Sequence, residues 1–175
     1  TFIRFLIAVF LVSNSIFARG YDVFGIGYYD VKFDGSSTNK ATYFRYERRF
    51  DNVLVDIGPE EDNYFYLKPF AGIEATSKSA YYILGGIYLE DNLGQLFIGD
   101  RSNFIFIPSF GVGYYDDGNG KKLGNKIEFR TTFEISYEMQ NKNRIGLSFS
   151  HISNANISNT NPGVEIISLS YQIPY

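Results

Sequence analysis

The chain lacks cysteine and tryptophan altogether and has a single histidine among its 175 residues. Without cysteine, neither a disulfide framework nor a thiolate zinc site can form, and one histidine is too few for a multi-histidine metal cluster. Basic residues are not in excess either, because 16 Lys and Arg stand against 19 Asp and Glu. The net charge of −3 argues against a nucleic-acid platform, which depends on many Lys and Arg contacts to phosphates. We therefore expect no metal, no cofactor and no nucleic-acid partner.

Long hydrophobic runs are absent as well, apart from one short block near the N-terminus. A spanning helix needs about 20 mostly apolar residues, and the block from Phe5 to Val12 is far shorter. The basic Arg4 precedes it and small or polar residues follow it, which is the layout of a secretory signal peptide. We expect residues 1–18 to be this signal, with cleavage after Ala18. A buried N-terminal strand or helix is the alternative.

Tyr and Phe are abundant instead, with 15 and 17 copies, so the chain is too aromatic to be disordered. After the signal, these residues fall into eight segments of alternating polarity, separated by turn residues and without a sustained helical period. The pattern predicts an all-β fold in a single domain, residues 19–175. The eight segments are Tyr21–Lys32, Thr42–Asp56, Tyr64–Ala75, Ser79–Glu90, Asn103–Tyr115, Lys126–Glu138, Arg144–Ser153 and Val164–Tyr175.

The segment Lys126–Glu138 shows the alternation most clearly, because one parity is apolar and the other mixes acids with Arg and Lys. Periodicity alone does not separate a soluble barrel with an apolar interior from a membrane barrel with a polar lumen. The export signal, the even number of segments, their length, and the aromatic residues near many segment ends favour the membrane barrel. We predict an eight-stranded antiparallel transmembrane β-barrel of the bacterial outer membrane, with a charged network in its lumen.

The connections between segments can be assigned to the two sides of the membrane, because both termini of such barrels face the periplasm. The periplasmic connection Asp91–Ser102 is long, so it is expected to hold a short helix or to extend a strand. The predicted extracellular loops are Asp34–Ala41, Thr76–Lys78, Asp116–Asn125 and Asn154–Gly163.

The single histidine, His151, lies near the end of the seventh segment. Continuing that segment's apolar parity includes His151 and Ser153, and the apolar parity of the eighth segment includes Glu165. A hairpin symmetric about Ser158 pairs His151 with Glu165. Polar side chains on a lipid-facing surface are costly unless they bond to one another. We therefore expect Ser153 as nucleophile, His151 as general base and Glu165 as the carboxylate that orients the imidazole.

The alternative is that a His-x-Ser pair at a strand end only forms interfacial hydrogen bonds. The following segment Asn154–Asn161 is by default a loop rich in Asx turns, and Gly163 belongs to a turn. Their functional interpretation is an oxyanion hole or a support for the site, with Asn154, Asn161 and Gly163 as the candidate residues near Ser153.

Two elements, His151-Ile152-Ser153-Asn154-Ala155 and Asn161-Pro162-Gly163-Val164-Glu165, resemble the signature of the outer-membrane lipid A 3-O-deacylases, the PagL-type acyloxyacyl hydrolase family. Pro69–Gly72, Glu128–Arg130 and Arg144–Leu147 resemble barrel segments of that family. The resemblance implies removal of the ester-linked 3-position acyl chain of lipid A by a Ser153, His151 and Glu165 triad without a metal. It also implies that Asn154 and Asn161 support the triad or its oxyanion hole.

The predicted function is accordingly that of an outer-membrane serine esterase with lipopolysaccharide as substrate and outer-membrane lipids as partners. The sequence is compatible with both a monomer and a homodimer. One rival is a non-catalytic barrel used for adhesion or membrane integrity. A second rival is a barrel that binds or conducts a small apolar ligand through its interior, against which the charged parity of the sixth segment argues.

Overall fold

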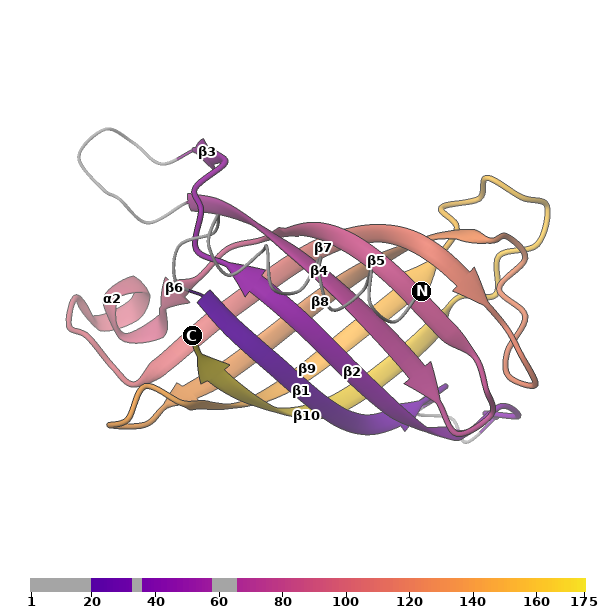
Figure 1. Cartoon of the computed structure of the whole chain (residues 1–175), viewed down its shortest axis with the longest axis horizontal. Helices are drawn as coiled ribbons and strands as arrows, with labels where there is room; N and C mark the ends of the chain where they lie inside the picture. The colour runs from indigo at the N-terminus through magenta and orange to yellow at the C-terminus, as the bar shows by residue number, and fades with distance from the viewer. Residues whose placement is uncertain (1–19, 33–35, 58–65) are drawn as a thin grey trace, which may run out of the picture.

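A computed structural model describes residues 20–32, 36–57 and 66–175. Its main feature is a ring of eight long antiparallel strands (Figure 1). The pairing of the first with the last long strand, and of β2 with β4, closes the ring and confirms the predicted eight-stranded barrel. The long strands are β1 (Gly20–Tyr29), β2 (Ala41–Phe50), β4 (Tyr66–Thr76), β5 (Tyr81–Tyr88), β7 (Phe104–Asp116), β8 (Ile127–Glu138), β9 (Arg144–Ser153) and β10 (Val164–Pro174).

Three short elements lie at one end of the barrel, the end that also holds the C-terminus (Figure 1). They are β3 (Val55–Asp56), which pairs with the start of β4, β6 (Asp91–Asn92), which pairs with β7, and the helix α2 (Leu93–Ile98). The predicted second segment is thus divided into β2 and β3.

The helix α2 begins and ends at clear signals. The side chain of Asn92 accepts hydrogen bonds from the N–H groups of Gly94 and Gln95, and Gly99 ends the helix at φ +74°. The long predicted turn therefore does hold a short helix. Within the three described ranges, no helix has the length and hydropathy required to cross a membrane. The predicted signal, residues 1–18, lies outside the described residues, as do the first two residues of the predicted segment Tyr64–Ala75.

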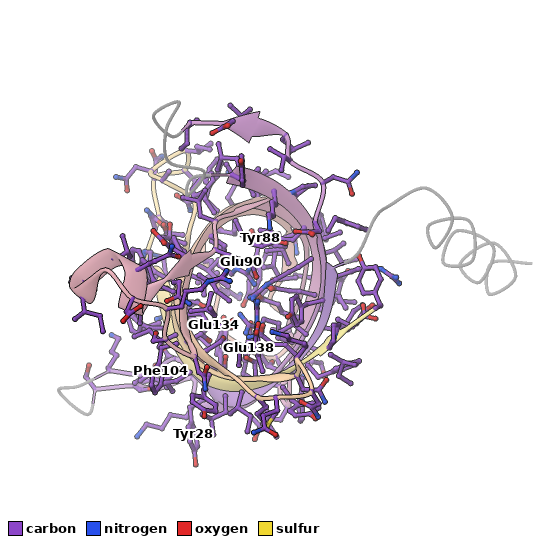
Figure 2. The ribbon with its side chains drawn as sticks, turned by 90° about the vertical axis from the view of Figure 1, so that its left-hand side faces the viewer. Tyr28, Tyr88, Glu90, Phe104, Glu134 and Glu138 are labelled. Atoms are coloured by element: carbon purple, nitrogen blue, oxygen red, sulfur yellow. The ribbon has the colours of Figure 1, made fainter. Side chains whose placement is uncertain are left out.

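The lumen of the barrel is polar and its outer surface is apolar. Along β8, Arg130 and Glu134 are fully buried, whereas Phe133 and Ile135, on the other parity, are about half exposed. Figure 2, viewed along the barrel, shows Glu134 inside the ring of strands and Tyr28 outside it. This distribution is that of a membrane barrel, because a soluble barrel would place its apolar parity inside.

Six buried charged side chains of β2, β4 and β8 form a connected network in the lumen, as the sequence predicted. Arg45 and Arg49 donate hydrogen bonds to Glu134 at 2.6 and 2.9 Å. Arg130 bonds to both Glu47 and Glu74 on the opposite wall. Since each of these six side chains faces an opposite charge, the Coulomb attraction offsets the loss of water around them. The network therefore links β2, β4 and β8 across the interior.

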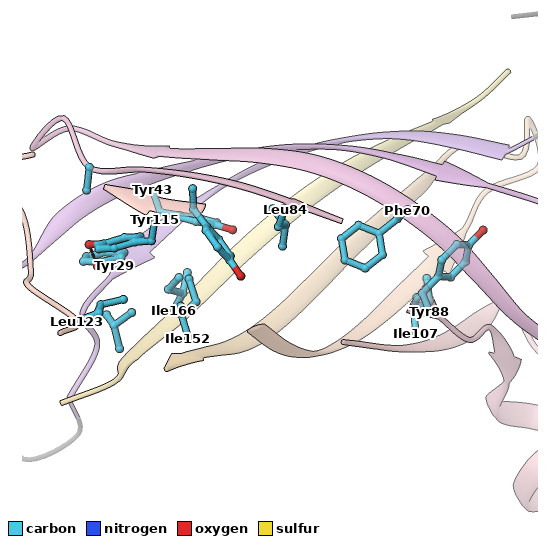
Figure 3. Packing of buried hydrophobic residues seen from close by; sticks show 13 residues of the cluster. Tyr29, Tyr43, Phe70, Leu84, Tyr88, Ile107, Tyr115, Leu123, Ile152 and Ile166 are labelled. Atoms are coloured by element: carbon cyan, nitrogen blue, oxygen red, sulfur yellow. Dashed lines mark hydrogen bonds between the residues drawn. The ribbon is translucent and has the colours of Figure 1, made fainter. Parts of the chain in front are cut away.

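Buried apolar side chains fill the lumen on either side of this network (Figure 3). Tyr29, Tyr115 and Leu123 gather toward the end opposite the C-terminus, and the hydroxyls of Tyr29 and Tyr115 are 2.7 Å apart. Phe70 and Tyr88 lie toward the other end. A cavity bordered by Tyr29, Tyr43, Tyr82 and Tyr115 has a volume of only about 10 Å³, room for about one water molecule. The filled, charged lumen speaks against a ligand-conducting barrel.

We expect Glu134→Ala to lower the free energy of unfolding by about 3–5 kcal/mol, because it leaves the buried guanidinium groups of Arg45 and Arg49 facing no carboxylate at that site. Asp116→Ala is the control, since it removes a half-exposed ion pair with Lys126 at the barrel rim and should change stability little. Denaturant unfolding in detergent measures both. Equal stability of the two variants would contradict a structural role for the network.

Candidate active site

The candidate site is built on the β9–β10 hairpin, at the barrel end opposite the C-terminus (Figure 1). Glu165 pairs directly with His151, which is the register predicted from the symmetry about Ser158. Further along the hairpin, Leu147 pairs with Leu169 on the same parity, and both are exposed. The alternate parity of β9 and β10 is buried. The His–Glu pair therefore continues the exposed apolar parity of the two strands.

The side chains of His151 and Glu165 meet across the two strands. Nδ1 of His151 lies 3.2 Å from Oε1 of Glu165, and the two side chains are 45% and 31% exposed. An ionised carboxylate can only accept a hydrogen bond, so Nδ1 of the neutral imidazole is assigned the proton. This tautomer leaves the lone pair on Nε2, the nitrogen turned away from Glu165. Nε2 is then the atom that can accept a proton from a reacting group.

Ser153 lies two residues beyond His151 on the same parity of β9 and is half-buried. Among residues 20–32, 36–57 and 66–175, its hydroxyl forms no hydrogen bond. The structure thus brings His151 and Glu165 together, while the serine hydroxyl is near in sequence but not bonded to the imidazole. Rotation about the Cα–Cβ bond of serine moves the hydroxyl between three staggered positions. Hydrogen bonds between catalytic groups are often long before substrate binds.

Gly163 lies directly against the imidazole ring. Its φ of +58° is in the left-handed region, which glycine adopts without strain. A Cβ atom at this position would be 2.7 Å from Cε1 of His151 and 3.3 Å from Nε2. Both the backbone conformation and the close approach therefore require glycine. The sequence marked Gly163 only as a turn and supporting residue, and its contact with the imidazole was not predicted.

Asn154 and Asn161 brace the loop that joins β9 to β10. The side-chain nitrogen of Asn154 is buried and donates hydrogen bonds to the carbonyls of Leu123 and Thr160, each at 2.9 Å. The side-chain oxygen of Asn161 accepts from the backbone N–H of Asn154 at 3.1 Å. Both residues fix this loop, and their support of the site stays a prediction. An oxyanion role for Asn154, Asn161 or Gly163 stays a prediction.

The loop between β9 and β10 rests on the loop between β7 and β8. A Cβ atom at Gly124, where φ is +95°, would lie 1.9 Å from the carbonyl oxygen of Thr160. Lys121 of the same loop donates a 2.6 Å hydrogen bond to Asp30, just after β1. Three connections at this end of the barrel are thus joined beside the candidate site. In the part of the chain that the structure describes, no three His, Asp or Glu side chains gather as metal ligands.

Comparison with known proteins gives concordant results. A family model described as Lipid A 3-O-deacylase (PagL) matches residues 27–174. A lipid A deacylase PagL from Bordetella bronchiseptica is 39% identical over 51 residues, which is 29% of this chain and 29% of that relative. The matched stretch thus spans less than a third of that relative.

Solved structures match over most of the barrel. The crystal structure of the outer membrane enzyme PagL has a TM-score of 0.62 at 17% identity, covering 89% of this chain and 99% of that one. A de novo designed transmembrane β-barrel has a TM-score of 0.57 at 10% identity, covering 90% and 95%. Neisserial surface protein A has a TM-score of 0.51 at 11% identity, covering 89% and 94%. At these identities the likenesses establish the fold.

We expect Gly163→Ala to displace the imidazole of His151, because the added methyl group would overlap Cε1. Gly99→Ala is the matched control, since Gly99 also has a left-handed φ but has no atom within 4 Å of the added Cβ. Both variants should lose roughly 1–2 kcal/mol of stability through backbone strain. Only Gly163→Ala should shift the NMR signals of the imidazole, which are unambiguous because the chain has one histidine. An unchanged spectrum would contradict the contact.

Proposed function

This chain is an outer-membrane β-barrel that belongs to the Lipid A 3-O-deacylase (PagL) family, and we propose that it hydrolyses the 3-O-linked acyl ester of lipid A with Ser153, His151 and Glu165. The family supports the substrate and the bond that is cleaved. We further propose that residues 1–18 direct its export.

The observation that carries the proposal is the 3.2 Å contact between Nδ1 of His151 and Oε1 of Glu165 on the exposed parity of the barrel wall. His151 and Glu165 continue the parity that carries the exposed Leu147 and Leu169, where apolar residues would meet lipid more favourably. Polar residues kept in such surroundings are typical of functional sites.

The first half of the reaction transfers the acyl chain to the enzyme. The hydroxyl oxygen of Ser153 attacks the ester carbonyl carbon while Nε2 of His151 takes the hydroxyl proton. The tetrahedral intermediate then collapses, the bond to the sugar oxygen breaks, and His151 gives the proton to that oxygen. The deacylated sugar leaves with a free hydroxyl, and the acyl chain remains on Ser153.

The second half releases the fatty acid. A water molecule gives a proton to Nε2 of His151 and attacks the acyl carbonyl, and the proton returns to Ser153 as the acyl–oxygen bond breaks. Glu165 stays ionised throughout, holds the imidazole in the Nδ1–H tautomer and stabilises its charged form. Backbone amides and the Asn161 side chain of the β9–β10 loop are the proposed donors to the oxyanion, because the amide hydrogens of Asn154 are already bonded to Leu123 and Thr160.

The position of the site suits a lipid of the outer leaflet. The hairpin end that carries His151 lies opposite the C-terminus (Figure 1), and the C-terminus of such barrels faces the periplasm. The proposed site would therefore lie at the extracellular end of the wall, within reach of the acyl esters of lipopolysaccharide in the outer leaflet. A substrate would approach sideways, by diffusion within the leaflet.

We expect Ser153→Ala to abolish release of the 3-position acyl chain, with a loss on the order of 10⁴-fold or more, because no nucleophile remains. Ser150→Ala is the control: it lies on the same strand but on the buried parity, where its hydroxyl bonds to Thr132. Mass spectrometry of lipid A after incubation with purified protein measures both. Full acyl-chain loss with Ser153→Ala would remove the serine mechanism, and intact lipid A with the wild type would favour the non-catalytic barrel.

Glu165→Gln should lower kcat by roughly 10²–10⁴-fold with little change in KM, because a glutamine amide can stabilise the wrong tautomer and does not stabilise the imidazolium. Glu138→Gln is the matched control at the periplasmic end, where Glu138 accepts from Lys142 and Arg144. Steady-state hydrolysis of a lipid A substrate in detergent distinguishes them. Equal kcat values for the two variants would show that Glu165 does not act on the histidine.

A further inference from the structure

The outer surface of the barrel carries a long groove beside the candidate site. Two hollows, of about 640 and 500 Å³, share Tyr28, Thr42 and Ile167 in their walls and so form one continuous groove over β10, β1 and the start of β2. Tyr28 is 75% exposed and projects from the outside of the ring of strands (Figure 2). No residue of the groove was among the predicted site residues.

The two ends of the groove differ in chemistry. The lower end is apolar, with Ile26, Leu147 and Leu169 in its walls. The upper end, at the extracellular rim, is lined by Lys32 and Lys40. A lipid molecule has the same polarity along its length, with apolar chains below and a charged headgroup above.

The charge at the upper end is positive overall. Asp30 also lines this end, but it is buried and its carboxylate is bonded to Lys121 at 2.6 Å. Burial opposes ionisation of Asp30, but hydrogen bonds from Lys121, Ser37 and the Asn39 amide outweigh it and lower the pKa of that carboxyl. Its charge is therefore matched by Lys121. Lys32 and Lys40 are exposed and remain available to an anion.

The groove is continuous with the site through the strand that carries Glu165. Ile167 of the groove is two residues from Glu165 on the same parity. The backbone N–H of Val31, which also lines the groove, donates a 2.9 Å hydrogen bond to the carbonyl of Glu165. A ligand in the groove would thus lie against the β1 side of the His–Glu pair.

We propose that this groove binds a phosphate-bearing part of the lipid substrate, with Lys32 and Lys40 contacting the phosphate and Tyr28 and Ile167 packing on an acyl chain of the same molecule. This inference rests on the proposed function, and it adds a recognition element to the hydrolytic site. It follows from the lysines at the upper end of the groove and the apolar residues at its lower end, which match the polarity of a lipid. It also follows from the hydrogen bond between Val31, which lines the groove, and Glu165. Lys32 and Lys40 set affinity for the phosphorylated substrate and take no part in bond cleavage.

The test compares Lys32→Gln/Lys40→Gln with wild type on two substrates: bisphosphorylated lipid A, and the same lipid A with both phosphates removed. The variant should raise KM for the phosphorylated substrate about fivefold, since two exposed charge contacts are lost, and leave kcat unchanged. On the dephosphorylated substrate its KM should equal that of wild type. Lys122→Gln/Lys126→Gln, which removes the same charge from the β7–β8 connection, is the control and should not change either KM.

The outcomes separate the two proposals. Wild-type protein that cleaves neither substrate would contradict the proposed function. Wild-type protein that cleaves both, together with equal KM values for the Lys32→Gln/Lys40→Gln variant and the control, would overturn the phosphate site alone. An equal rise in KM on both substrates would also overturn it, because the lysines would then not act through phosphate.

The apolar part of the groove has its own test. Thr42 is exposed and lines both hollows, so Thr42→Trp should fill the groove and raise KM at least fivefold on both substrates. Ile83→Trp, on the exposed face of β5 across the barrel, places the same ring in the lipid belt and should leave KM unchanged. Wild-type KM for Thr42→Trp would show that the substrate does not occupy the groove.

Discussion

The register between β9 and β10 is the constraint on which the candidate site depends. Because side chains alternate strictly along a strand, a slip of one residue would move His151 to the buried parity and separate it from Glu165. The observed register is supported from both faces. Inside the barrel, the hydroxyls of Ser148 and Ser168 bond to each other at 2.7 Å, and outside, Leu147 faces Leu169. The loop that joins the strands is then held by the buried amide of Asn154, so the pairing is fixed at its loop end as well.

Contacts across the lumen hold the strands of the barrel wall in fixed positions. A barrel strand has no layer of helices behind it, so its position depends on what fills the interior. Here Glu134 of β8 accepts from Arg45 and Arg49 of β2, and Arg130 bonds across to Glu47, which ties opposite walls together. Gln172 of β10 also donates to Glu134 at 2.7 Å, so the strand that carries Glu165 belongs to the same network. The charges that the sequence places on one parity thus hold the residues of the other parity in place.

The sequence predicts those parts of the fold and site that follow from local periodicity. The bounds of β9 coincide with the predicted Arg144–Ser153, and the His151–Glu165 pairing follows from counting along one hairpin. The break between β2 and β3 was not predicted: both pieces pair with β4, β2 along Phe70–Thr76 and β3 with Tyr66 and Leu67, and local periodicity does not show where the chain leaves that strand and returns to it. The contact of Gly163 with the imidazole was missed for a similar reason, since a Pro-Gly turn specifies a backbone conformation and not its neighbour. The groove is assembled from strands at both ends of the chain, and no sequence window contains it.

In a soluble protein, the interaction within a half-exposed His–Glu pair would be weak, because water competes for the hydrogen bond and screens the charge. On the wall of a membrane barrel the same exposure has a different meaning, because the surrounding medium is lipid and the interaction between imidazole and carboxylate is less screened. In a soluble esterase, a closed pocket excludes water from the reacting groups. Here the bilayer would exclude water, and the barrel wall would need only to orient the reacting groups and the substrate. The proposed catalytic apparatus can therefore consist of three side chains on one hairpin, with glycine at position 163 where the imidazole leaves no room for a side chain. It also requires that substrate orientation come from the barrel surface, which is the role that the geometry of the neighbouring groove is suited to fill.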